Sequence, residues 1–180
     1  DFGELLRDAD TAMYRAKASG KARCALFDAA LHTEVSNRLQ LENDLRAAIA
    51  QETLDIVYQP LFHIGNGRLR GFEALTRWNH PTRGPIPPSI FIPIAEEGGL
   101  IVPLGEFVLD AACAELARWR RTVPGAGSFT MSVNLSPRQI GSGDIVEVVA
   151  EALDRHGLPG DAIWLEITEN VMAEDSVTTA

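Results

Sequence analysis

Two short apolar runs separated by one amphipathic helix constrain the fold of this 180-residue chain more than any other feature. The runs cover residues 129–135 and 162–168, and the helix between them begins after Asp144 and ends at Gly157. Strand–helix–strand units at about 30-residue spacing are typical of parallel sheets. The pattern therefore predicts an α/β domain with a parallel sheet, and it does not by itself distinguish an open sheet from a barrel.

An antiparallel hairpin is expected before the parallel part of the sheet. Residues 54–64 and 68–78 are two β-type runs, and the Gly-Asn-Gly sequence between them is a strong turn signal. The proline-rich segment 80–88 is expected to be loop. Two helices should follow it, over about 89–97 and 103–121.

The N-terminal part of the chain is expected to be mostly helical. A first helix should end at Gly20, a short strand should occupy residues 23–27, and a second helix should run over about 29–51. The second helix carries charges along its length. We interpret it as a solvated linker between domains.

Composition excludes several kinds of partner. A formal net charge of −9 argues against binding to long nucleic acid, which needs a basic face. No stretch approaches the roughly 20 apolar residues of a membrane span, so no membrane contact is expected within this segment. Cys24 and Cys113 match no metal-ligand spacing, which favours a reduced, cytoplasmic setting. The chain opens without Met or a signal peptide, and it is expected to be cut at both ends.

Each predicted parallel strand carries polar residues on one face, reaching its carboxyl end. Asn134 and Glu166 are the side chains of greatest interest there. Ligand sites of α/β folds lie at the carboxyl ends of parallel strands, and hard cations prefer oxygen ligands of this kind. We interpret these positions as a metal site, and the alternative is a Glu166 salt bridge inside the sheet.

The hairpin carries a weaker candidate pair, Glu73 and Arg77, on one strand face. A carboxylate and a guanidinium suit a metal and a phosphate respectively. Taken alone, such a pair is more often a solvated surface pair. The four histidines have no ligand spacing, and the chain has no Walker-type loop or nucleophile elbow.

Five motifs occur in a fixed order along the chain. They are Tyr58-Gln59-Pro60, Gly71-Phe72-Glu73-Ala74-Leu75-Thr76-Arg77-Trp78, Phe91-Ile92-Pro93-Ile94-Ala95-Glu96-Glu97, Ser132-Val133-Asn134-Leu135-Ser136 and Leu165-Glu166-Ile167-Thr168-Glu169. Together they resemble the EAL family of cyclic-di-GMP phosphodiesterases. The likeness covers roughly residues 41–180 and corresponds to the first half of that domain.

The resemblance implies a partial TIM-like (β/α)8 barrel with an antiparallel first strand. It implies that the complete protein hydrolyses one phosphodiester of cyclic di-GMP to linear pGpG, with Mg²⁺ or Mn²⁺ as cofactor. A homodimer through this domain is also expected. The implied metal ligands are Glu73, Asn134 and Glu166, the implied catalytic residues are Glu73 and Glu169, and the implied substrate contacts are Gln59, Leu75 and Arg77.

The N-terminal segment is similar to the last helix of a GGDEF domain, from Leu5 to Arg23. The expected organisation is therefore the end of a GGDEF domain over 1–28, a helical linker over 29–40 and half of an EAL domain over 41–180. The family's paired aspartates, a lysine and a further glutamate come after the point where this chain stops. The 180 residues alone are thus expected to be inactive.

Two other functions compete with hydrolysis of cyclic di-GMP. A degenerate EAL domain binds the nucleotide or a protein partner without turnover. A barrel hydrolase that uses paired carboxylates on a sugar is a more distant alternative, and it explains neither Asn134 nor the ordered motifs.

Overall fold

The computed structural model describes residues 29–141 and 144–167. The chain divides into two compact units, Asp1–Leu45 and Arg46–Ala180, and the second contains the sheet. The helix expected to end at Gly20 and the strand expected over residues 23–27 lie outside the described residues. Helix α2 has the bounds Ala29–Ala50, as predicted to within one residue.

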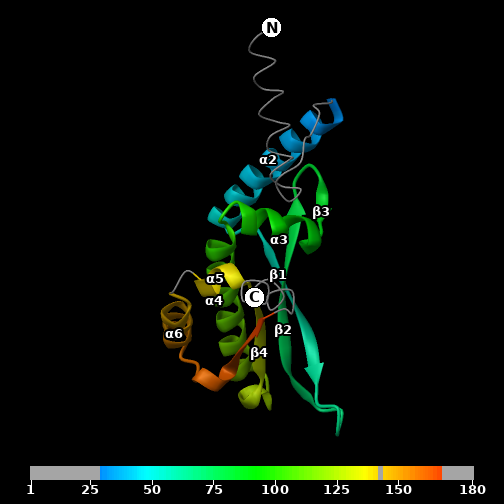
Figure 1. The fold of residues 1–180 in the computed structure, drawn as a ribbon. Coiled ribbons are helices and arrows are strands. Elements are labelled where there is room, and N and C mark those ends of the chain that lie inside the picture. The colour runs from blue at the N-terminus through cyan, green and yellow to red at the C-terminus, as the bar shows by residue number, and fades with distance from the viewer. Residues whose placement is uncertain (1–28, 142–143, 168–180) are drawn as a thin grey trace, which may run out of the picture. The chain divides into compact units, whose positions relative to one another are not determined.

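Four strands form the main sheet, in the spatial order β1-β2-β4-β5 (Figure 1). β1 pairs antiparallel with β2, whereas β2, β4 and β5 are mutually parallel, so the hairpin and the parallel sheet are both confirmed. The strands are β1 (Asp55–Phe62), β2 (Leu69–His80), β4 (Thr130–Leu135) and β5 (Ile163–Ile167).

The prediction that residues 80–88 form only a loop is wrong. Strand β3, Gly84–Ile86, folds back and pairs antiparallel with the end of β2. Two backbone N–H groups in the turn donate to Nδ1 of His80, each at 3.2 Å, and Gly84 takes a φ of +71°, which favours glycine. Pro85 lacks an N–H donor, but an edge strand tolerates this loss.

The helices follow the predicted pattern with one addition. Helix α6 ends at Gly157, which takes a left-handed φ of 64°. Asp144 occupies the N-cap position as expected, but its side chain makes no capping hydrogen bond. Helix α5 was not predicted. The elements are α3 (Pro88–Glu97), α4 (Ile101–Thr122), η1 (Ala126–Ser128), α5 (Pro137–Gly141), α6 (Ile145–His156) and η2 (Gly160–Ala162).

One face of the sheet packs against helices, chiefly α4, with α6 on the outer side of α4 (Figure 1). Alternation along β4 directs Met131, Val133 and Leu135 to this face, and all three are buried. Phe91 of α3 and Leu104 and Leu116 of α4 are among the largest fully buried side chains. Burial of these apolar side chains fixes the register of β4, because a one-residue slip would turn them to the other face.

Among the described helices, none combines the length and the apolar character that a membrane crossing needs.

Candidate functional site

Four of the predicted site residues form a row across the face of the sheet opposite the helices. In the antiparallel register Gln59 lies opposite Glu73, and in the parallel register Asn134 lies beside Glu166. β4 connects the two pairs, because Glu73 is level with Ser132, two residues before Asn134. The predicted polar face is therefore continuous over four strands.

A hydrogen bond joins two of these side chains directly. Nδ2 of Asn134 donates to Oε1 of Glu73 at 2.8 Å. This bond uses neither the second carboxylate oxygen of Glu73 nor the amide oxygen of Asn134. Asn134 and Glu166 are exposed and Glu73 is half-buried, so the three side chains are accessible from one side.

Leu75 and Arg77 continue the same face of β2 toward its carboxyl end. They line a cavity of about 270 Å³ together with Asn134, where β2 and β4 end beside α3 and α4. The guanidinium of Arg77 is half-buried and donates to the backbone oxygen of Thr76 at 2.9 Å. Arg77 thus lines a pocket to which one of the metal-ligand candidates, Asn134, also contributes.

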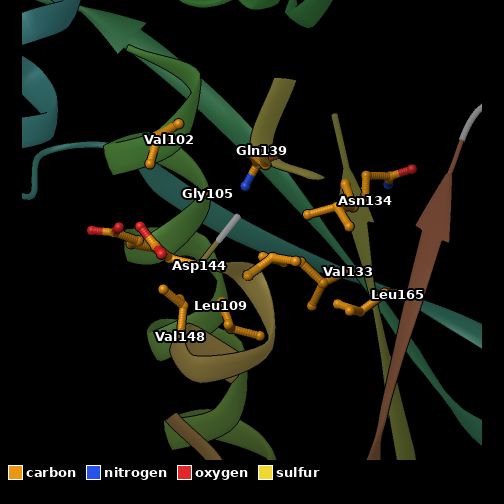
Figure 2. Close-up of a pocket in the computed structure, with 12 residues that line it drawn as sticks. Val102, Gly105, Leu109, Val133, Asn134, Gln139, Asp144, Val148 and Leu165 are labelled. Atoms are coloured by element: carbon orange, nitrogen blue, oxygen red, sulfur yellow. The ribbon is translucent and has the colours of Figure 1, made fainter. Parts of the chain in front are cut away.

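A smaller cavity of about 70 Å³ lies behind β4, between the sheet and helices α4 and α6. Figure 2 shows the apolar side chains of Leu109, Val133, Val148 and Leu165 around it, while the amide of Asn134 points away from them. We assign this cavity to packing between helices and sheet rather than to the polar face.

The donor set fits a hard divalent cation. Glu73, Asn134 and Glu166 offer two carboxylates and one amide oxygen from three adjacent strands, and such oxygens are what Mg²⁺ and Mn²⁺ prefer. Within residues 29–141 and 144–167, no three His, Cys, Asp or Glu side chains gather as a metal site by themselves. The fit therefore depends on the asparagine as a third ligand.

The structure brings together six of the seven residues predicted for the site. They are Gln59, Glu73, Leu75, Arg77, Asn134 and Glu166. Glu169 lies outside the described residues.

Three residues that were not among those predicted for the site form hydrogen bonds just after the end of β4. The hydroxyl of Ser136 donates to Oε1 of Glu96 at 2.8 Å, and the N–H of Ser136 donates to Oε1 of Gln139 at 2.9 Å. A serine followed three residues later by glutamine, with Pro137 between them at the first helical position, is a helix-start signal that was available in the sequence. It would have predicted α5.

Among the described residues, the ionisable groups with clear pKa shifts lie on α4 or, in the case of Tyr58, pack against it. Burial, and then the negative charge of Glu115, raises the pKa of Tyr58 to about 12, while Arg118 opposes the shift. Burial alone would raise the pKa of the Asp110 carboxyl, but hydrogen bonds from His156 and Arg155 outweigh it and lower the pKa.

Comparison with known proteins identifies the family of this chain. A family model described as EAL domain matches residues 42–180. The bifunctional diguanylate cyclase/cyclic di-GMP phosphodiesterase MucR of Pseudomonas aeruginosa is 40% identical over 173 residues, which is 96% of this chain and 25% of that protein. The cyclic di-GMP phosphodiesterase NbdA of the same organism is 34% identical over 169 residues, 94% of this chain and 21% of that protein.

A solved structure described as PaMucR phosphodiesterase, c-di-GMP complex, superposes with a TM-score of 0.70 at 42% identity. The match covers 76% of this chain and 55% of that one. The chain spans about a quarter or less of the length of these curated relatives. The expected mixed α/β class is confirmed, and the solved EAL domains that it resembles are TIM-barrel-like. With more than half of its residues matched by the family model, this chain belongs to the EAL domain family.

Proposed function

We propose that the complete protein carrying these residues hydrolyses cyclic di-GMP. The observation that carries this proposal is the adjacency of Glu73, Asn134 and Glu166 on the accessible face of the sheet. Two relatives named as cyclic di-GMP phosphodiesterases and a related structure described as a c-di-GMP complex support the choice of substrate.

The proposed reaction is the attack of water on one phosphorus atom of the cyclic dinucleotide. A new phosphorus–oxygen bond forms, the bond to one ribose 3′-oxygen breaks, and that oxygen takes a proton to give linear pGpG. When bound, Mg²⁺ or Mn²⁺ supplies activation of water and charge stabilisation for such a displacement. Glu73, Asn134 and Glu166 are the residues that would hold the ion.

The other candidate residues act on the substrate. The guanidinium of Arg77 matches the geometry and charge of a phosphate, and its charge opposes the negative charge that grows in the transition state. Gln59 is exposed opposite Glu73, where its amide is available to orient the nucleotide. Leu75 offers an apolar contact in the same pocket. Glu169 is proposed to support the catalytic face.

We also propose a domain organisation, a cellular compartment, an oligomeric state and an activity for the 180 residues by themselves. Residues 1–28 form the end of a GGDEF domain, 29–40 a linker and 41–180 half of an EAL domain. The complete protein is a cytoplasmic homodimer. The 180 residues alone do not turn over the nucleotide: β5 has no further paired strand within the described residues, and it exposes Leu165 and Ile167 on its helix-facing side.

Incubation of the complete protein with cyclic di-GMP and Mn²⁺, followed by chromatographic detection of pGpG, tests this function. Turnover should be abolished by excess chelator and restored by Mg²⁺ or Mn²⁺. Ca²⁺ should inhibit, because it prefers longer bonds and more ligands. Binding of the nucleotide without pGpG formation would instead identify a receptor, and turnover that persists in chelator would exclude the metal mechanism.

A further inference from the structure

The segment immediately after β4 is held by an array of hydrogen bonds. The backbone N–H of Ser136 donates to the side chain of Gln139 at 2.9 Å, and its carbonyl accepts from the N–H of Gln139 at 3.0 Å. The hydroxyl of the same serine donates to Oε1 of Glu96 at 2.8 Å. All the hydrogen-bonding groups of Ser136 thus have a defined partner, and Asn134 lies only two residues earlier in the chain.

A second contact ties α3 to the same segment. The guanidinium of Arg138 donates to the backbone oxygen of Glu96, so this glutamate is bound through both its carboxylate and its carbonyl. Along the chain, α3 is separated from β4 by the whole of α4 and by η1. The two bonds hold the segment that begins at Ser136, where the strand pairing has ended: the ladder of β4 with β2 stops at Val133, and its ladder with β5 stops at Leu135.

The glutamine side of the array is built into the core. Gln139 is only 6% exposed, and its side-chain nitrogen lies so close to Gly105 that a Cβ on that glycine would be 1.9 Å from it. A buried polar side chain that makes its hydrogen bonds is costly to displace. Gln139 therefore holds the backbone of Ser136 in a fixed position, and Glu96 binds the hydroxyl of the same serine.

We propose that Glu96 is a positioning residue, which fixes the carboxyl end of β4 through Ser136 and thereby sets the place of Asn134 in the site. The inference rests on the proposed function, because it gives Glu96 a role in holding one member, Asn134, of the ligand set described above. Glu96 also lines the pocket that contains Arg77 and Asn134. Groups that orient a metal ligand typically change metal affinity or activity by about 10- to 100-fold when removed.

Three variants of the complete protein separate this role from general stability. Glu96→Ala removes the acceptor for Ser136, whereas Glu96→Gln keeps a side-chain oxygen at that place. Glu151→Ala removes an exposed carboxylate from α6 and is the matched control. Amide hydrogen exchange over residues 133–140 measures how firmly the segment is held. Calorimetric titration with Mn²⁺ alone measures the ligand set without any turnover.

Glu96→Ala should speed exchange over residues 133–140 at least about tenfold and weaken Mn²⁺ binding by about 10- to 100-fold. Glu96→Gln should stay within about threefold of the parent in both measurements, and Glu151→Ala should match the parent. Unchanged exchange in Glu96→Ala, or faster exchange with unchanged Mn²⁺ affinity, would overturn the proposal. A parent protein that neither binds Mn²⁺ nor forms pGpG would overturn the proposed function, and the exchange data would still decide whether Glu96 holds the end of β4.

Discussion

Asn134 donates its side-chain amide to Glu73 at 2.8 Å across 61 residues of sequence. The parallel pairing of β2 with β4 makes this contact possible. Gly71 is needed at the first pair of this ladder, opposite Thr130, because a Cβ there would lie 2.0 Å from the carbonyl oxygen of Thr130. The absent side chain allows the two strands to approach, and the polar row above them depends on this approach.

Replacing the candidate ligands should separate activity from stability. In the complete protein, Glu73→Gln and Glu166→Gln should each lower turnover by more than the ~10- to 100-fold typical of a merely supporting residue. The melting temperature should stay the same or rise, because each change removes a like charge from a site without bound metal. Glutamine at position 73 also retains an oxygen that accepts from Asn134. Thermal melts and pGpG assays provide the check, and variants that melt well below the parent would mark these residues as structural.

Arg77 should act on the substrate rather than on the fold. Arg77→Ala should lower kcat/KM by about 10- to 100-fold, as expected for loss of a hydrogen bond between charged groups. Arg77→Lys should recover only part of this, since an ammonium lacks the planar fork of donors that matches a phosphate. Arg68→Ala, at an exposed arginine ahead of β2, is the control. Steady-state kinetics with cyclic di-GMP would contradict the assignment if all three variants behaved alike.

Because Gly105 contacts Gln139, the change in stability caused by Gly105→Ala should depend on whether Gln139 is present. Gly105→Ala improves helix propensity by up to about 1 kcal/mol, but it displaces Gln139 and breaks a buried hydrogen bond at a cost of about 1–3 kcal/mol. The net effect should be a loss of stability. In a Gln139→Ala background the same change should stabilise. Denaturant unfolding of the parent, the two single variants and the double variant measures both stability changes. Equal effects of Gly105→Ala with and without Gln139 would refute the contact.

Tyr58 should give the fold a component of alkaline sensitivity. Its ring packs edge-on against Trp119, with centroids 5.0 Å apart, and burial raises its pKa to about 12. Because the folded-state pKa lies above the ordinary value of 10.0, this contribution to stability is complete below pH 10 and is lost as the pH rises toward 12. Tyr58→Phe should therefore lose less stability than the parent over pH 10–12 in denaturant titrations. Parallel pH profiles for the two proteins would show that Tyr58 does not titrate in this range.

Much of this architecture was determined by the sequence itself. The alternation of apolar and polar residues in residues 129–135 and 162–168 placed Asn134 and Glu166 on one face, and the structure confirms it. The reason is local, because successive side chains of a strand point to opposite faces whatever the strand pairs with. The turn sequence between residues 54–64 and 68–78 likewise predicted the hairpin without tertiary information.

The tertiary structure decided which of these faces meet. Strand alternation cannot give the register between β2 and β4, so the pairing that brings Glu73 to Asn134 depends on packing of β4 against α4 and on the close approach at Gly71. Strand β3 escaped prediction because the segment around it, residues 80–88, is rich in proline, and its pairing comes from the turn closed by His80. The link from Glu96 to Ser136 joins groups 40 residues apart, and only the folded arrangement of α3 beside the end of β4 creates it.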